Sequence, residues 1–180
     1  SVDDATGAMV KAVERRAPNT LFVYLSDNGV MEGVHRLVNK NVPYRLAHEV
    51  PMYMRWDGVI EPGSVSERIT ATIDVTATIA EAAGVTWPME GRSALSTPRT
   101  GVVLEAVRNG KRPAYCGWRS QNYLYVRYTA GAGRELYDYR VDPAELDNVA
   151  GKARYAGIEA RLDRKTERNC QPFPPEFSWN

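Results

Sequence analysis

Hydrophobic positions in the first part of the chain change between helical spacing and short continuous runs. A first helix, up to residue 16, is predicted from apolar residues three or four positions apart: Val2, Ala5, Met9, Ala12 and Val13. The unbroken apolar run at 21–25 is typical of a strand buried on both faces of a parallel sheet. A second short strand at 51–55 and a helix at 74–83 follow. Helix, strand, strand and helix in this order predict an α/β layer over residues 1–95.

The pattern changes after a Ser-Thr-Pro stretch at 96–98. Short strand candidates separated by turn residues follow, at 101–104, 114–118, 123–128 and 135–139. Two further helices are predicted at 144–149 and 158–167. Residues 96–180 are therefore expected to form a second, smaller domain, an antiparallel sheet that carries a helix.

Composition narrows the classes of function. The chain has 180 residues, of which 43% are hydrophobic, and 23 Lys and Arg against 22 Asp and Glu give a net charge of +1. This balance gives no electrostatic reason to expect nucleic acid as a partner. No apolar run approaches the ~18 residues of a membrane span. A soluble enzyme or a binding domain remains.

Cysteine and histidine are too sparse for a zinc site. Cys116, Cys170, His35 and His48 are the only residues of these types, and no metal-ligand spacing joins them. The cysteines form either a disulfide or two buried thiols. We expect them to lie within bridging distance, because Cys116 falls in a predicted strand and Cys170 follows the helix that should pack on that sheet.

Candidate chemistry lies directly after the first apolar run, in Ser26-Asp27-Asn28-Gly29. Sites in open α/β sheets form beyond the carboxyl ends of strands. The carboxylate of Asp27 and the carboxamide of Asn28 offer two oxygen ligands to a hard cation such as Ca²⁺ or Mg²⁺. The alternative is a plain turn, because Asp-Asn-Gly is also a favourable turn sequence.

Lys40 lies 13 residues after Asp27, beyond a loop. Beside a metal ion, its ammonium group is suited to hold the oxygens of a tetrahedral anion. The alternative is a solvated loop lysine, which single lysines usually are.

Several motifs then occur along the chain in one order. The first group is Ser26-Asp27-Asn28-Gly29, Gly33-Val34-His35-Arg36, Lys40, Tyr44 and Val50-Pro51-Met52. The second is Asp74-Val75-Thr76-Ala77-Thr78-Ile79, Ala83-Gly84 and Gly91-Arg92-Ser93-Ala94-Leu95. The third is Glu135-Leu136-Tyr137-Asp138, Asp142-Pro143, Glu145-Leu146 and Asn148. This series resembles the sulfatases of the alkaline-phosphatase-like superfamily over nearly the whole chain.

Four positions depart from the pattern of that family. Val34 replaces the usual Glu, and Ala77 the usual Pro. Arg45 replaces the Glu after the Tyr, and Glu49 replaces the Arg before Val-Pro. The last two exchanges reverse a pair of charges four residues apart, so we expect an ion pair with its sign switched.

The nucleophile motif of the family, C/S-x-P-x-R, is not matched. The stretch at 170–174 has Pro174 in place of the Arg and lies at the wrong end of the chain, and the stretch at 96–99 has its Arg one place early. Asp3 and Asp4 begin a helix and do not follow a buried strand, so they do not match the metal-binding Asp pair of the family. The chain is thus expected to be the C-terminal part of a sulfatase.

The resemblance implies that the intact enzyme hydrolyses a sulfate ester, with a formylglycine nucleophile and a divalent cation, most often Ca²⁺ and alternatively Mg²⁺. It implies that Asp27 and Asn28 ligate the metal and that Lys40 binds sulfate or leaving-group oxygens. His35 is a weaker catalytic candidate, since an imidazole can donate a proton near neutral pH. The chain alone is expected to bind Ca²⁺ poorly and to be inactive without the N-terminal part. Export is a further expectation from the family.

Two alternatives stay open. A phosphodiesterase or phosphonate hydrolase of the same superfamily would keep the metal site and cleave phosphorus esters. A non-catalytic partner-binding domain is the other. An upstream C/S-x-P-x-R motif in the coding sequence would favour the enzyme.

Overall fold

The structure, a computed structural model, describes residues 1–180 and contains two compact units. The first unit comprises Ser1–Asp27 and Val50–Pro98, and the second comprises Asn28–Glu49 and Arg99–Asn180. Residues 28–49 thus pack with the C-terminal sheet, although the sequence analysis placed them in the first domain. The predicted domain boundary between residues 95 and 96 stays a prediction.

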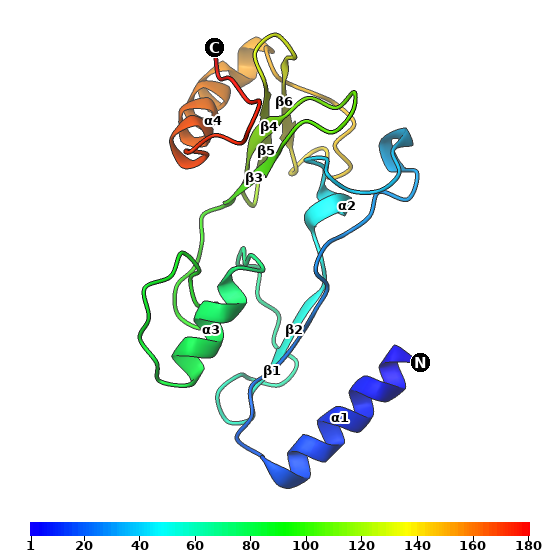
Figure 1. The fold of residues 1–180 in the computed structure, drawn as a ribbon, viewed down its shortest axis with the longest axis vertical. Coiled ribbons are helices and arrows are strands. Elements are labelled where there is room, and N and C mark those ends of the chain that lie inside the picture. Colours follow the sequence, from blue (N-terminus) through cyan, green and yellow to red (C-terminus); the bar gives the residue numbers. More distant parts are fainter. The chain divides into compact units, whose positions relative to one another are not determined.

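The first unit holds two helices and a two-stranded sheet: α1 (Val2–Arg16), β1 (Phe22–Leu25), β2 (Met52–Arg55) and α3 (Asp74–Ala82) (Figure 1). All four elements match predicted ones. Helix α1 begins at a capping box, in which the backbone N–H of Asp4 donates to the hydroxyl of Ser1. Asp4 therefore belongs to the helix cap, and Asp3 lies in the first turn of the helix.

Strand β1 differs from its prediction. It pairs antiparallel with β2, with Tyr24 opposite Tyr53, and both of these side chains are exposed. The apolar run at 21–25 predicted a strand buried on both faces of a parallel sheet. Within this chain β1 has β2 as its one hydrogen-bonded neighbour, so its apolar residues are only partly covered.

Helix α3 holds the segment that follows it through two buried polar side chains. The carboxylate of Asp74 accepts from the N–H of Arg92 at 2.7 Å, and the hydroxyl of Thr78 accepts from the N–H of Ala94 at 2.9 Å. Both side chains are fully enclosed. The Asp-x-x-x-Thr spacing of this helix therefore has a structural role in this unit, as a brace for residues 91–95.

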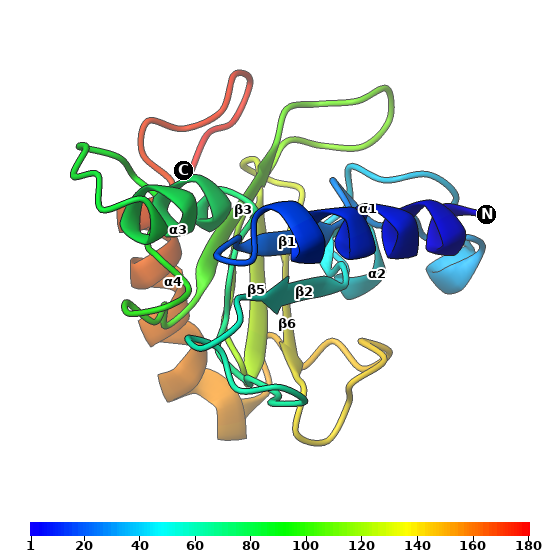
Figure 2. The same ribbon diagram turned by 90° about the horizontal axis from the view of Figure 1, so that it is seen from below.

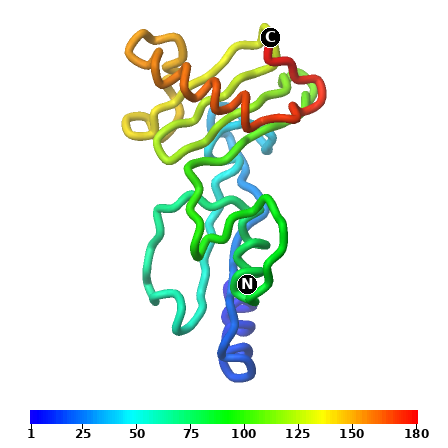
Figure 3. The backbone as a smooth tube through the Cα atoms, turned by 90° about the vertical axis from the view of Figure 1, so that its left-hand side faces the viewer, coloured from blue at the N-terminus to red at the C-terminus, as the bar shows by residue number.

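The second unit is built on an antiparallel sheet in sequence order, formed by β3 (Val102–Ala106), β4 (Tyr115–Arg119), β5 (Tyr123–Tyr128) and β6 (Arg134–Asp138). Helix α4 (Ala156–Asn169) lies along one face of this sheet, as Figure 2 and Figure 3 show from two sides. Two 3₁₀ turns, η1 (Val34–Arg36) and η2 (Ala153–Tyr155), and the short helix α2 (Arg45–His48) complete the unit. The predicted small sheet with a packed helix is confirmed.

Alternate residues of the sheet face two different layers. On one face Tyr125 and Leu136, which are opposite each other in register, pack with Leu162 of α4. On the other face Leu124 and Tyr137 pack with Tyr44 from the segment at 28–49. That segment therefore covers the face of the sheet that α4 leaves open.

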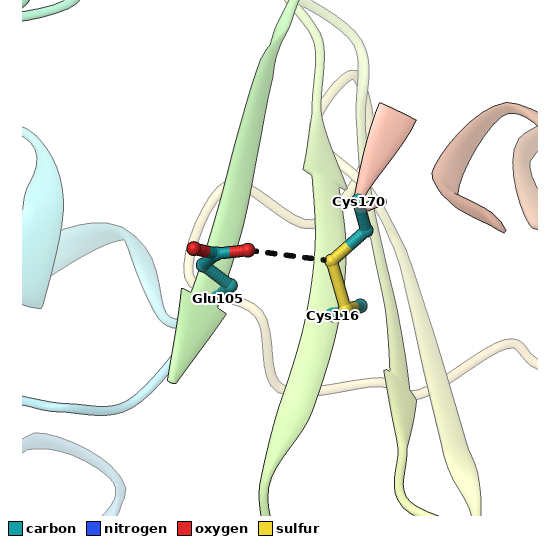
Figure 4. A group of neighbouring side chains, drawn as sticks. All are labelled: Glu105, Cys116 and Cys170. Carbon is teal, nitrogen blue, oxygen red and sulfur yellow. Dashed lines mark hydrogen bonds between the residues drawn. A yellow bond between two sulfur atoms is a disulfide. The ribbon is translucent and has the colours of Figure 1, made fainter. Parts of the chain in front are cut away.

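The cysteines form a disulfide between β4 and the end of α4. The Cα atoms of Cys116 and Cys170 are 6.2 Å apart, which confirms the expected proximity. Figure 4 shows Glu105 of β3 directed at this bridge, with its carboxylate 3.6 Å from the sulfur of Cys170. Trp179 of the C-terminal tail packs on the same cluster.

The predicted helix at 144–149 is wrong. Glu145 has a positive φ of 58°, which an α-helix does not allow. The side chain of Asp142 accepts from two backbone N–H groups, and that of Asn148 accepts from the N–H groups of Leu136 and Ala150. These local side-chain hydrogen bonds compete with helix formation and hold a loop instead.

None of the helices in this chain combines the length and the apolar character that a membrane-spanning helix requires.

Candidate functional site

The motif at 26–29 ends strand β1 without forming a hairpin turn. Gly29 does not have a positive φ, so the turn-forming property of glycine is not what this position uses. Its N–H donates to the carbonyl of Ala47 at 3.1 Å, and a Cβ atom here would lie 1.9 Å from the carbonyl oxygen of Leu46. The glycine is therefore required because two stretches of backbone approach each other closely.

Asn28 and Lys40 meet within the second unit. The ammonium group of Lys40 donates a short hydrogen bond to the Oδ1 atom of Asn28, while the Nδ2 atom of Asn28 donates to the carbonyl of Gly29 at 3.0 Å. The two residues are 12 positions apart and belong to motifs that the sequence analysis selected separately. The structure brings these two predicted site residues together.

Their side chains line an open cavity of about 530 Å³. The lining residues are Asn28, Val30, Asn39, Lys40, Asn41, Asn109 and Arg112. Two cations and four carboxamides are present, and no carboxylate is. Such a lining is suited to a negatively charged ligand.

The loop that carries Lys40 is fixed by its backbone. Asn39 and Asn41 have φ values of 72° and 67°, a left-handed conformation that asparagine tolerates better than most residues. The N–H of Met31 donates to the carbonyl of Asn39 at 2.9 Å, and the side chain of Met31 is fully buried. The loop is therefore closed at its base, and Lys40 is presented between two constrained residues.

A buried carboxylate connects this segment with the loop after β6. Glu145 is 3% exposed and accepts the N–H of Arg45, which starts α2, with its two oxygens at 2.9 and 3.2 Å. The hydroxyl of Tyr139 donates to the same carboxylate at 2.6 Å. Burial raises the pKa of the Glu145 carboxyl above its ordinary value, although these hydrogen bonds oppose the shift.

The reversed charge pair is confirmed. The guanidinium of Arg45 donates to both carboxylate oxygens of Glu49, at 2.5 and 2.7 Å, and Arg119 lies 3.4 Å from the same carboxylate. Burial raises the pKa of Glu49, but the hydrogen bonds and charges of Arg45 and Arg119 outweigh it and lower that pKa overall. The ion pair joins the first residue of α2 to the residue that follows the helix, with its sign switched as expected.

His35 contacts Tyr44 and the loop that follows β6. Its ring stacks on Tyr44 with ring centroids 4.4 Å apart, and its Nε2 atom is 3.2 Å from the carbonyl of Ala144. It is not among the residues that line the cavity. These contacts describe a packing residue, and the catalytic role of His35 stays a prediction.

His48, in α2, is held neutral by its surroundings. Burial, and then the nearby charge of Arg119, lowers the pKa of this imidazole to about 4. Neither ring nitrogen has a hydrogen-bond partner that satisfies normal geometry. Protonation would place a charge among residues that already include two arginines.

The remaining sequence candidates are not among the residues that line the cavity. Asp27 is exposed and is the last residue of the segment Ser1–Asp27 of the first unit, and its carboxylate lies 3.5 Å from the hydroxyl of Ser26. Its predicted role as a metal ligand with Asn28 stays a prediction. Cys170 is held in the disulfide, and Ser96 donates to Glu81 at 2.7 Å, so both have structural contacts in line with their exclusion as nucleophiles.

Sequence reasoning missed Asn109 and Arg112, which line the cavity from the turn between β3 and β4. The Asn-Gly pair at 109–110 between two strand candidates is a standard hairpin signal and could have predicted this turn. It could not have predicted that the turn reaches the Lys40 loop, because that contact depends on how residues 28–49 pack on the sheet.

Comparisons with known proteins show what the chain is similar to. A family model described as Sulfatase matches residues 1–85. An N-acetylglucosamine-6-O-sulfatase from Bacteroides thetaiotaomicron is 29% identical, and the match covers 96% of this chain and 34% of that protein. The chain therefore spans about a third of the length of this curated relative.

Solved structures show the same fold. One, a protein in complex with its substrate D-glucosamine-2-N,6-O-disulfate, has a TM-score of 0.85 and 26% identity, covering 94% of this chain and 38% of that one. A phosphonate monoester hydrolase from Silicibacter pomeroyi has a TM-score of 0.82 and 26% identity, covering 95% of this chain and 39% of that one. Together with the family match, these findings show that the chain is similar to sulfatases and shares their alkaline-phosphatase-like fold.

Substitution of Gly29 tests the packing of this loop. Gly29→Ala should disrupt the segment at 28–49, because a Cβ atom 1.9 Å from the carbonyl of Leu46 forces the two backbones apart. We expect a loss of about 2 kcal/mol or more in unfolding free energy, measured by chemical denaturation. Gly157→Ala in α4, where a Cβ atom meets nothing within 4 Å, is the matched control and should be neutral or slightly stabilising. Equal stability of both variants would contradict the close contact.

The stability of the chain should depend on His48 below neutral pH. The unfolded imidazole takes up a proton near its ordinary pKa of 6.5, whereas the folded one does so only near 4. The stabilisation from the neutral ring is therefore complete above 6.5 and is lost as pH falls through this window. In denaturation curves at pH 7.5 and 4.5, His48→Gln should show a smaller fall in unfolding free energy than the wild type. An identical fall in both proteins would rule out this role.

Proposed function

We propose that the protein acts as a sulfuric ester hydrolase and that this chain supplies part of its metal and sulfate site. The observation that carries the proposal is the contact of Lys40 with Asn28 in a cavity lined by cations and carboxamides and free of carboxylates. The sulfatase relatives and structural neighbours support it. A sulfated sugar is the substrate class that the names of these proteins favour.

Asp27 and Asn28 fit the chemistry of a divalent cation site. A carboxylate and a carboxamide oxygen are hard donors of the kind that Ca²⁺ and Mg²⁺ take, and the two residues are neighbours in the chain. They supply two of the roughly six to eight oxygens that Ca²⁺ requires, so other residues have to complete the site. When bound, the cation would polarise the sulfate oxygens of the ester. Ca²⁺ is the ion we favour.

Lys40 would hold the sulfate group. Its ammonium is a compact cation with three donors, of which the contact with Asn28 uses one. The remaining donors can bind an anionic oxygen of the sulfate or the developing charge on the leaving-group oxygen. Asn28 would then orient Lys40 and also supply an oxygen ligand to the cation. His35 remains a weaker candidate for proton donation.

No residue of this chain fits the formylglycine nucleophile that the similarity to sulfatases implies. Formation of the Cys116–Cys170 bridge supports our further proposal that the protein is exported, because disulfides persist mainly in oxidising compartments.

A second candidate activity is hydrolysis of phosphonate or phosphate esters. The structural similarity to a phosphonate monoester hydrolase favours it, because both activities need an anion held beside a metal ion. Rates for matched aryl sulfate, phosphate diester and phosphonate esters, measured on the full-length gene product, separate the two. Faster cleavage of the sulfate ester supports the proposed function, and faster cleavage of a phosphorus ester contradicts it.

Lys40 gives the sharpest test of the site. In the full-length protein, Lys40→Ala should lower kcat/KM for an aryl sulfate by about a hundredfold or more, the scale of losing one charged transition-state contact. Lys40→Arg should rescue only part of this loss, because a planar guanidinium does not replace a compact ammonium.

Lys152→Ala serves as the control, since Lys152 pairs with Asp147 and does not line the cavity. It should leave activity within about twofold of the wild type. Near-normal activity of Lys40→Ala would refute the role given to Lys40.

A further inference from the structure

The cavity beside Lys40 has a second cation that the proposed function does not use. Arg112 lines the same cavity from the turn between β3 and β4, whereas Lys40 comes from the segment at 28–49. Each cation is therefore carried by its own loop, and no carboxylate in the lining neutralises either one. Two separate positive groups in one cavity are suited to a ligand with two negative groups.

Arg112 is held in place through its backbone and through its side chain. Asn109 and Arg112 pair through both backbone N–H groups, at 3.1 and 3.0 Å, across a two-residue turn whose Gly110 has a φ of 58°. The Nη1 atom of Arg112 donates to the backbone carbonyl of Lys40 at 3.2 Å. This hydrogen bond uses one of five guanidinium donors, so the group is oriented next to Lys40 with donors left to bind a ligand.

The cavity is larger than one sulfate group needs, and more polar side chains line it than one sulfate group can contact. Its volume of about 530 Å³ lies within the range of sites that hold whole small molecules, which is roughly 300–1,000 Å³. Asn39, Asn41 and Asn109 add uncharged donors and acceptors of the kind that bind hydroxyl groups. The lining therefore offers contacts for the part of the ligand beyond its sulfate ester.

We propose that Arg112 is a specificity-determining residue that binds a second negatively charged group of the substrate, a carboxylate or a second sulfate. Lys40 holds the sulfate ester at the same time, so this inference rests on the proposed function. A guanidinium suits this task because its planar pair of donors matches two oxygens of a carboxylate or sulfate.

A purely structural role for Arg112 makes a different prediction. If its only task is to hold the carbonyl of Lys40, loss of Arg112 should lower the affinity for every sulfated ligand by the same factor. A direct contact instead weakens only ligands that carry the second anionic group. Discrimination between ligands, and not affinity alone, therefore decides between the two roles.

The test is equilibrium binding to the 180-residue chain, measured by NMR titration. The probes are glucosamine 6-sulfate, glucosamine-2-N,6-O-disulfate and a monosulfated disaccharide with one uronate carboxylate. The proteins are the wild type, Arg112→Ala, Arg112→Lys and Lys40→Ala, each checked for folding by circular dichroism. Comparison of the disulfate with the uronate probe identifies which anionic group Arg112 prefers.

We expect the wild type to bind at least one doubly charged probe about tenfold more tightly than the monosulfate. Arg112→Ala should remove this preference and change the monosulfate affinity by less than about twofold, and Arg112→Lys should restore only part of it. An equal loss for all probes, an unchanged preference, or no binding of any probe by the wild type would overturn the inference.

Lys40→Ala separates this inference from the proposed function. This substitution should weaken the binding of all three probes, because each carries the sulfate ester. If Lys40→Ala has no effect while Arg112→Ala removes the preference, the Arg112 contact stands and the sulfate role of Lys40 fails.

Discussion

A buried carboxylate, that of Glu145, ties the segment at 28–49 to the rest of the second unit. It accepts the first N–H of α2, at Arg45, and the hydroxyl of Tyr139. An ionised carboxylate at 3% exposure is costly unless its oxygens are hydrogen-bonded, so these partners must stay in place. Because α2 ends the segment that contains Asn28 and Lys40, this one contact fixes the end of the loop that forms the cavity.

Further contacts position the segment along its length. The hydroxyl of Tyr44 lies 3.3 Å from the carboxylate of Glu135, and burial together with the charge of Glu135 raises the pKa of this phenol. At the other end, Gly29 donates to the carbonyl of Ala47 and brings the two ends of the segment together. The cavity thus depends on a loop closed on itself and held against the sheet, which is how two residues 12 positions apart come to share a hydrogen bond.

Much of the fold could be predicted from periodicity, because α1, α3, α4 and the strands of the small sheet each have a clear apolar pattern. The prediction of a helix at 144–149 was wrong although the apolar pattern there is helical. The side chains of Asp142 and Asn148 accept hydrogen bonds from the backbone, and Glu145 takes a positive φ.

Within the site, Asn28 and Lys40 were predictable as separate candidates. Arg112 was not, because its place beside Lys40 is set by packing between segments about 70 residues apart. The antiparallel pairing of β1 was missed for a related reason, since an apolar run does not specify its partner strand.

The anchoring role of Glu145 is tested most directly by native-state hydrogen exchange in Glu145→Ala. Removal of the carboxylate leaves the N–H of Arg45 without its acceptor, at a cost of about 1–3 kcal/mol. The amides of Arg45 and Gly29 should then exchange about tenfold or more faster, while the amide of Val126 in the centre of β5 stays within about twofold of the wild type. Unchanged protection of Arg45 and Gly29 in the folded variant would contradict the claim that Glu145 holds the site segment in place.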